Sequence, residues 1–309
     1  MTNLKKLGLT ALAGSLVATS AFAGEMSVSG TAKVSYTSGD TLAVTGNPWS
    51  ASNALSFSGG GELDNGMSVS VSIATDTGST AFSSSNMVLD MGDAGKFAVS
   101  KEMSSGHGYN AYQDKMPTAG EEVWDDMAGE ASGRVGMEDN GTISYGNSIA
   151  GANFSVAYNK DSATDGSDKS VGIDYSPVDG LMIFGARADI SAGSNATNKH
   201  TTFGATYTTM GATIGMQRTA LSKNTANTDE DRTHIAASFA VNENLSVSYG
   251  MSTVEFESSA KTDQEDSGFA ASYTMGSMSF SASSNKSDNA SGTSGNDDTH
   301  KEVSVAFAF

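Results

Sequence analysis

The chain has 309 residues, a formal net charge of −18 and no cysteine. The acidic excess disfavours nucleic acid and anionic surfaces as partners, and the lack of cysteine excludes a disulfide framework in an exported protein. With only 3 prolines, long β ladders can run without interruption.

The first 23 residues have the pattern of a secretory signal peptide. Lys5 and Lys6 precede an apolar stretch at residues 7–17, and Ala-Phe-Ala at residues 21–23 is a small-x-small cleavage site. The apolar stretch is short and rich in small and hydroxyl residues, which disfavours a membrane-spanning helix. We therefore expect a mature domain at residues 24–309. Without the two signal lysines, 15 basic residues remain against 35 acidic ones, a net charge of −20.

Apolar residues then recur at every second position through most of the mature chain. The pattern begins with EMSVSGTAKVSY at residues 25–36 and ends with KEVSVAFAF at residues 301–309. A period of 2 is typical of strands with one apolar face, and no convincing 3.6-residue period follows the signal peptide. The domain is therefore predicted to be all-β.

Short turns and long polar segments alternate between these strands. Seven short turns have Asn-Gly, Asp-Gly or Gly chemistry, and about eight longer segments separate them, which implies about sixteen antiparallel strands. The polar faces are mostly Ser, Thr, Gly and Asn, which suit a water-filled interior. In a membrane, strands must close into a barrel to pair every backbone group, and sixteen strands leave an aqueous lumen. The prediction is a transmembrane antiparallel β-barrel.

The longest break in the alternation, at residues 101–134, follows the fifth predicted strand and is strongly acidic. A structureless segment of this length is usually functional or disordered, and three interleaved aromatic residues favour a loop that folds against something. The acidic residues of this segment are Asp114, Glu121, Glu122, Asp125, Asp126 and Glu130.

Several cations fall on the predicted polar faces of strands. By strand phase these are Lys33, Arg187 and Arg232, with His234 beside the last. Taken singly, each charge is better explained as an ordinary solvated charge than as a functional one. One unit charge at about 6 Å contributes roughly 0.7 kcal/mol in water and about 3 kcal/mol at a dielectric constant near 20. Salt screens such charges within about 8 Å. We therefore expect a weakly cation-selective pore.

Motifs for catalysis or cofactor binding are absent. The sequence contains no G-x-S-x-G, C-x-x-C, H-E-x-x-H or P-loop string, and its four histidines are scattered. DSATDG at residue 161 resembles the start of an EF-hand, but Gly172 stands at the twelfth position, where an acid is needed. We expect no enzyme activity, no cofactor and no defined metal site, with nonspecific calcium binding by the loop carboxylates as the open alternative.

The mature chain resembles the Gram-negative general porins, most closely the alphaproteobacterial type. The resemblance lies in the first strand directly after the cleavage site, the acidic third long loop after strand five, the TISYG strand at residues 142–146 and the closing EVSVAFAF. It implies a homotrimer in the outer membrane of a Gram-negative bacterium, with the third external loop folded into the pore. Such porins carry a denser arginine cluster, whereas this chain has four arginines.

By this resemblance, specific residues acquire expected roles. The resemblance implies that five loop acids form the acidic side of the pore constriction: Asp114, Glu121, Glu122, Asp125 and Asp126. The basic side comprises Lys33, Arg134, Arg187 and Arg232. The C-terminal strand resembles the signal by which the barrel-assembly machinery recognises its substrates, with lipid-facing residues Val303, Val305, Phe307 and Phe309.

The favoured function is a passive diffusion channel for ions and small hydrophilic solutes. One alternative is an outer-membrane channel specific for one substrate class, which predicts saturable block by that substrate. The other is a structural or adhesive surface protein built as a β-sandwich or solenoid, which predicts no conductance.

Overall fold

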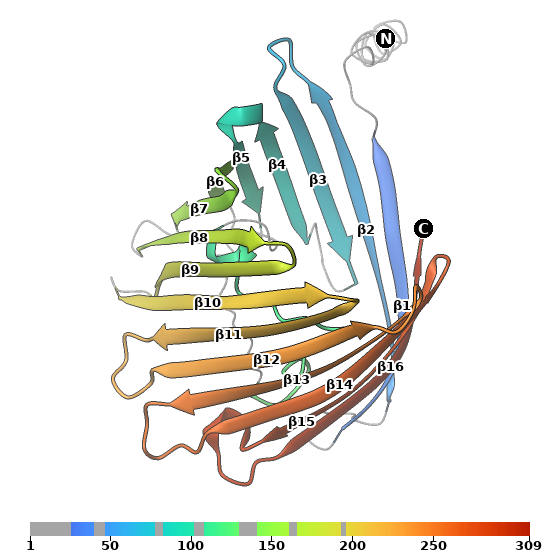
Figure 1. Cartoon of the computed structure of the whole chain (residues 1–309), viewed down its shortest axis with the longest axis vertical. Helices are drawn as coiled ribbons and strands as arrows, with labels where there is room; N and C mark the ends of the chain where they lie inside the picture. Colours follow the sequence, from blue (N-terminus) through green and yellow to red (C-terminus); the bar gives the residue numbers. More distant parts are fainter. Residues whose placement is uncertain are drawn as a thin grey trace, which may run out of the picture.

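The chain folds into a closed barrel of sixteen antiparallel strands, in which each strand pairs with its neighbours in sequence and the first pairs with the last (Figure 1). The structure is a computed structural model that describes residues 26–39, 47–77, 83–101, 108–129, 141–160, 166–192 and 196–309. The predicted fold class and strand number are confirmed. The predicted signal peptide and Arg134 lie outside the described residues.

The strands differ in length around the barrel. They are β1 (Ser27–Gly39), β2 (Trp49–Glu62), β3 (Ser68–Asp76), β4 (Ser84–Asp90), β5 (Lys96–Lys101), β6 (Thr142–Ile149), β7 (Ala152–Lys160), β8 (Ser167–Val178), β9 (Leu181–Ser191), β10 (Thr197–Thr209), β11 (Ala212–Ser222), β12 (Glu230–Ala240), β13 (Leu245–Phe256), β14 (Gln264–Met275), β15 (Met278–Asp288) and β16 (Asp298–Ala308). The shortest, β4 and β5, have 7 and 6 residues. From β8 onward every strand has at least 11 residues, so the wall is taller there.

The connections alternate as predicted, with seven short turns and eight longer segments. Two of the short turns, Ala150–Gly151 and Met210–Gly211, have positive φ at both residues, with values from 48° to 83°. This is the backbone of a type I′ turn, whose twist matches that of the flanking strands. Glycine at the second position adopts this conformation without steric cost.

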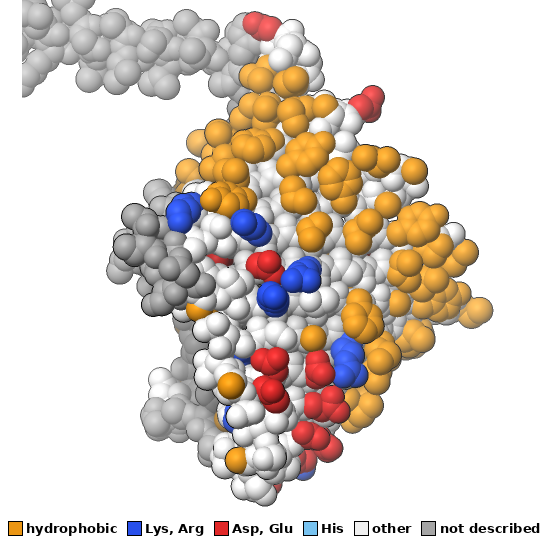
Figure 2. Space-filling view, turned by 90° about the vertical axis from the view of Figure 1, so that its left-hand side faces the viewer, with side chains coloured by type: hydrophobic (Ala, Val, Ile, Leu, Met, Phe, Trp, Pro, Cys, Tyr) orange, Lys and Arg blue, Asp and Glu red, His pale blue; other side chains and the backbone are white. Residues whose placement is uncertain are grey.

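The two faces of the wall differ in chemistry, as the alternation predicts. Large apolar side chains such as Phe203, Ile214 and Ile235 point outward and are about half exposed, whereas buried polar side chains such as Thr202 and Gln217 point inward. Figure 2 shows the outer hydrophobic side chains gathered in a broad band, with charged side chains beside it. None of the described residues forms a helix long and apolar enough to cross a membrane.

The C-terminal strand closes the barrel. The Phe309 amide donates to the Gly30 carbonyl at 3.0 Å and the Gly30 amide donates to the Phe309 carbonyl at 2.8 Å. Val303 and Phe309 are 59% and 62% exposed on the outer face, and the Phe307 and Phe309 rings stack at 6.2 Å. The predicted pairing and outward orientation of this strand are therefore confirmed. A terminal strand that completes the ladder leaves no unpaired sheet edge. A role in assembly stays a prediction.

Candidate functional site

Residues 108–129 of the long loop between β5 and β6, here called the inner loop, lie inside the barrel and follow its inner wall (Figure 1). Hydrogen bonds to inward-facing side chains hold it along the way. The Gly108 amide donates to Ser155 Oγ on β7 at 2.6 Å, the Ala119 amide to Ser248 Oγ on β13 at 2.8 Å, and the Ala128 amide to Asp298 Oδ2 on β16 at 2.8 Å. The predicted inward fold of the third long loop is therefore confirmed.

Aromatic packing fixes the first half of the loop. The described part of the loop begins with a 3₁₀ turn, η3 (Gly108–Ala111), and the Tyr112 ring then stacks on Phe184 of β9, with ring centroids 6.1 Å apart. The Tyr112 hydroxyl donates to Asp174 Oδ2 at 2.7 Å. Burial and the Asp174 carboxylate raise the pKa of Tyr112, so the hydroxyl stays a neutral donor.

A glycine of the wall makes room for this ring. A Cβ added at Gly172 of β8 would collide with the Tyr112 ring. Packing against Tyr112 thus explains why position 172, where an EF-hand would need an acid, is occupied by glycine. Only glycine allows the ring to lie against the backbone here.

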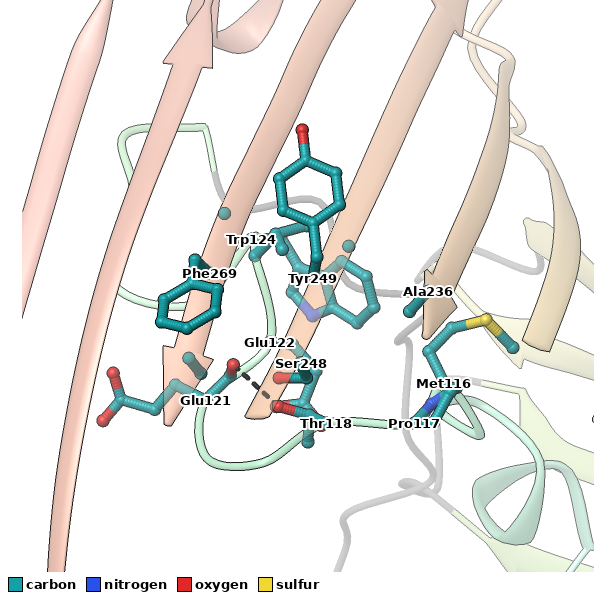
Figure 3. A pocket seen from close by; sticks show the side chains of 14 residues that line it. Met116, Pro117, Thr118, Glu121, Glu122, Trp124, Ala236, Ser248, Tyr249 and Phe269 are labelled. Carbon is teal, nitrogen blue, oxygen red and sulfur yellow. Dashed lines mark hydrogen bonds between the residues drawn. The ribbon is translucent and has the colours of Figure 1, made fainter. Parts of the chain in front are cut away.

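The middle of the loop docks on β12, β13 and β14. The Trp124 ring lies 4.3 Å from the His234 ring, centroid to centroid, and Val123 covers Gly250, where an added Cβ would lie 2.9 Å from Val123 Cγ1. A cavity of about 10 Å³ remains between loop and wall, bounded by Met116, Trp124 and neighbouring side chains (Figure 3). That is about the space for one water molecule, so the loop is packed onto the wall.

The five predicted loop acids form two clusters. The first contains Asp114, Glu122 and Asp125. The Glu122 amide donates to Asp125 Oδ2 at 3.2 Å. Burial, the hydrogen bond with Asp125 and the charge of Asp114 raise the pKa of Glu122 to about 9. Glu122 therefore carries a proton at neutral pH, and this cluster is less negative than the sequence indicates.

The second cluster lies where the loop meets β16 and β1. Glu121 and Asp126 come from the loop, and Glu302 from β16. Lys33 Nζ of β1 lies 2.6 Å from Glu302 Oε1 and 3.4 Å from Glu121 Oε1. Burial and the nearby Glu302 carboxylate raise the pKa of Glu121. His300 of β16 also reaches this cluster, with its ligand atom within 4.8 Å of those of Glu121 and Asp126.

The predicted basic residues do not form a wall opposite the acids. Lys33 points inward as predicted, but it pairs with Glu302 of β16 and with the loop acid Glu121, on the same side of the pore as the acids. Arg232 also points inward, and its guanidinium lies 2.8 Å from the Glu230 carboxylate. Each of these charges is therefore balanced locally, which weakens a field across the pore.

Arg187 requires a correction, because it lies on the outer face of β9. Its pairing partners, Val171 and Thr201, are both exposed on the outer surface, and residues paired directly opposite share a face. Its side chain is 53% exposed and lies 3.4 Å from Asp189. The strand LMIFGARADIS has apolar residues on both faces. Its inward-facing Phe184 can be apolar because the loop residue Tyr112 covers it. Strand phase alone therefore misplaced this residue.

Sequence reasoning missed the residues of the wall that hold the loop. Gln217 Nε2 of β11 donates to the Gln113 carbonyl at 2.8 Å, and Asn285 Nδ2 of β15 donates to the Glu122 carbonyl at 2.9 Å. Glu302 and His300 lie on the same inward phase of β16. The sequence signal that could have identified them is a polar side chain longer than Ser or Thr at an inward-facing position of a strand. A wall that faces only water does not need such a long side chain.

Comparison with known proteins gives a consistent result. A family model described as Gram-negative porin matches residues 8–309. Two solved structures of mutants of the porin of Rhodopseudomonas blastica superimpose with TM-scores of 0.66 and 0.65; each is 16% identical and covers 92% of this chain and 100% of its own. A structure described as "Asymmetric conductivity of engineered proteins" has the same TM-score of 0.66 and the same identity and coverage. No curated protein matches the sequence.

Proposed function

The chain belongs to the Gram-negative porin family and forms an outer-membrane channel, and we propose that its inner loop sets both the width and a weak cation preference of the pore. The family match covers nearly the whole chain, and the barrel closes with sixteen strands. A β-sandwich or solenoid is therefore ruled out, because those folds lack a closed ring of strands.

The docking of the loop is the observation that carries the proposal. Hydrogen bonds tie residues 108–129 to seven strands of the wall, β7, β8, β11, β13, β14, β15 and β16. A chain segment attached in this way occupies lumen that water would otherwise fill. The narrowest part of the pore is then bounded by the loop's exposed side chains, among them Asp114 and Asp126.

Charge supports the cation preference. Asp114 and Asp126 are exposed in the lumen, whereas Lys33 and Arg232 are each held by an acid. An exposed carboxylate within a narrow aqueous passage favours cations over anions. Because salt screens it within about 8 Å, the preference is modest, about threefold to tenfold for the roughly 0.7 to 1.4 kcal/mol that a few such charges supply.

Membrane assembly completes the proposal. Residues 1–23 would act as the export signal, the barrel would assemble as a homotrimer, and Val303, Val305, Phe307 and Phe309 would form the strand that the assembly machinery recognises. The outward orientation of these side chains on the closing strand supports the last role. The solutes would be ions and small hydrophilic molecules, without a cofactor.

Planar-bilayer recordings of the detergent-extracted protein under a salt gradient test the proposal. We expect stepwise openings in groups of three and a reversal potential of the sign that favours cations. An anion-favouring reversal potential would contradict the charge assignment. Saturable block by one sugar or amino acid class would instead indicate a substrate-specific channel.

A further inference from the structure

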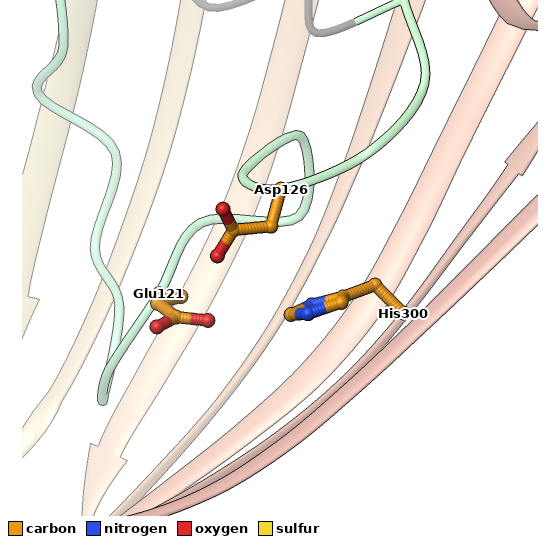
Figure 4. Close-up of side chains that lie close together, drawn as sticks. All are labelled: Glu121, Asp126 and His300. Carbon is orange, nitrogen blue, oxygen red and sulfur yellow. The ribbon is translucent and has the colours of Figure 1, made fainter. Parts of the chain in front are cut away.

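Three potential metal ligands meet at the point where the loop contacts β16. They are Glu121 and Asp126 of the loop and His300 of the wall, and one ligand atom of each lies within 4.8 Å of the other two. Figure 4 shows the His300 ring directed from β16 toward both carboxylates. Ligands held by one metal at about 2.1 Å are separated by about 3.4 Å in a tetrahedral site, so small side-chain rotations would bring the three to that spacing.

The His300 imidazole supplies an independent observation. The residue is only 3% exposed, and its Nδ1 has no hydrogen-bond partner among the residues that the structure describes. Buried polar atoms are nearly always paired, and one without a partner needs an explanation. The His300 ring is directed at two carboxylates, and a metal ion held between them would be a partner that an imidazole readily takes.

The charge balance at this point is also incomplete. Glu121, Asp126 and Glu302 carry three formal negative charges, and Lys33 supplies one positive charge. Lys33 is closer to Glu302, at 2.6 Å, than to Glu121, at 3.4 Å. It can therefore stay with Glu302 while Glu121 turns to another cation. The remaining formal charge of −2 matches a divalent ion.

We propose that Glu121, Asp126 and His300 form a site for a divalent transition metal such as Zn²⁺, which ties the inner loop to the barrel wall. One imidazole and two carboxylates, completed by water, suit zinc and its neighbours in the first transition row. Calcium and magnesium prefer oxygen ligands alone. This proposal revises the sequence-based expectation that the chain has no metal site.

The position of the proposed metal site determines how a bound metal would affect the channel. The ligands come from the loop and from the wall, so a bound metal crosslinks two parts that otherwise meet through hydrogen bonds and the Lys33 ion pair. It also replaces negative charge in the lumen with a neutral complex. Bound zinc would thus lower cation preference and hold the constriction in place. This effect on the current rests on the proposed channel function, whereas metal binding itself does not.

Calorimetric titration of Zn²⁺ into the detergent-extracted full-length protein tests the binding. We expect one saturable site per chain, and we expect His300→Gln and Asp126→Asn each to weaken it at least about tenfold, since even loss of an outer partner of a metal ligand costs that much. Two matched controls, His200→Gln on β10 and Asp125→Asn on the loop, should bind zinc as the unchanged protein does. Circular dichroism checks that each variant keeps its strands.

Two further measurements separate this proposal from the channel proposal. Co²⁺ in place of Zn²⁺ should give a visible absorption band that His300→Gln removes, and this result does not depend on conductance. In bilayers, Zn²⁺ but not Mg²⁺ should lower the cation preference of the unchanged protein and leave His300→Gln unaffected. Equal zinc affinity in the unchanged protein and in His300→Gln, or no saturable binding, would overturn the site. Binding without any change in current would overturn its effect on the pore.

Discussion

The two halves of the described inner loop, residues 108–119 and 120–129, differ in the balance of ring and polar contacts that attach them to the barrel. Residues 108–119 dock through rings, with Tyr112 on Phe184 and Tyr109 beside His200 at 6.1 Å. Residues 120–129 also pack one ring, Trp124 on His234, but they carry four of the five predicted acids and reach Lys33, Asn285 and Asp298 through polar contacts. In the proposed channel, the first half therefore contributes two of the three ring contacts that position the loop, and the second half contributes most of the charge that a solute would meet.

From this difference we expect that the width and the ion selectivity of the proposed pore can be changed separately. Rings packed on the wall respond little to pH or salt, because their attachment comes from burial. The acids respond to both, because their charge depends on protonation and screening. Substitutions in one half should thus alter one property and leave the other nearly unchanged.

Removing the aromatic anchor should have the largest effect. Tyr112→Ala deletes a buried ring, which costs about 3 to 5 kcal/mol in comparable sites, and also leaves Asp174 without the hydroxyl that donates to it. We expect the first half of the loop to detach and single-channel conductance to rise, with little change in the reversal potential. Tyr112→Phe, which keeps the ring and loses one hydrogen bond worth about 1 kcal/mol, should change conductance far less. Equal conductance in all three proteins would contradict the anchoring role.

Neutralising the second half should alter selectivity instead. The combined variant Glu121→Gln, Glu122→Gln, Asp125→Asn and Asp126→Asn should lower cation preference by up to about tenfold, the limit set by a few screened charges. Conductance at high salt should stay close to that of the unchanged protein. Reversal potentials measured at low and high salt give both quantities. An unchanged reversal potential at low salt would mean that these acids do not face the ions.

The pH dependence sharpens the assignment within the acids. Because the pKa of Glu122 is raised from about 4.5 to about 9 in the folded protein, the protonated form favours docking. The stabilisation is complete below about pH 4.5 and is lost as the pH rises through about 9. Cation preference should increase over the same upper range as Glu122 ionises. In Glu122→Gln this increase should disappear, while a persistent increase would assign the titration to another group.

A comparison of two cations has the smallest expected effect. Arg187→Gln should leave conductance and selectivity unchanged, because Arg187 lies on the outer face. Lys33→Gln removes the cation that partly neutralises Glu121 and Glu302. It should raise cation preference by about threefold at low salt, as expected for one nearby charge. A larger effect from Arg187→Gln than from Lys33→Gln would reverse the assignment of faces.

The sequence predicted most of the barrel but only part of the site. Strand number, turn positions and the closing strand follow from period-2 alternation and turn chemistry, which are local. The loop's inward fold came from resemblance. The position of Arg187 could not be predicted from LMIFGARADIS, because both faces of that strand are apolar and only the docked loop distinguishes them.

The locally paired charges were beyond sequence reasoning for a related reason. Lys33 and Glu121 are 88 positions apart, and their contact exists only once the loop lies against β1 and β16. The raised pKa of Glu122 likewise depends on burial against the wall. Residue types alone reveal neither the Lys33–Glu121 contact nor the raised pKa of Glu122. The inward-facing positions of Glu302 and His300 could be predicted from the alternation in β16, and they mark β16 as a strand that the loop contacts.

The most direct test of whether the inner loop lines the conducting path is to replace Asp126 with cysteine and label the thiol with reagents of either charge. The chain has no cysteine, so Asp126→Cys introduces the sole thiol, and Arg187→Cys provides a control on the outer face. We predict that a positively charged thiol reagent lowers cation current through Asp126→Cys in open channels, and that a negatively charged one does not. Arg187→Cys should respond to neither reagent. If neither reagent alters the current through Asp126→Cys after mass spectrometry has verified its labelling, the loop does not line the path and the account is contradicted.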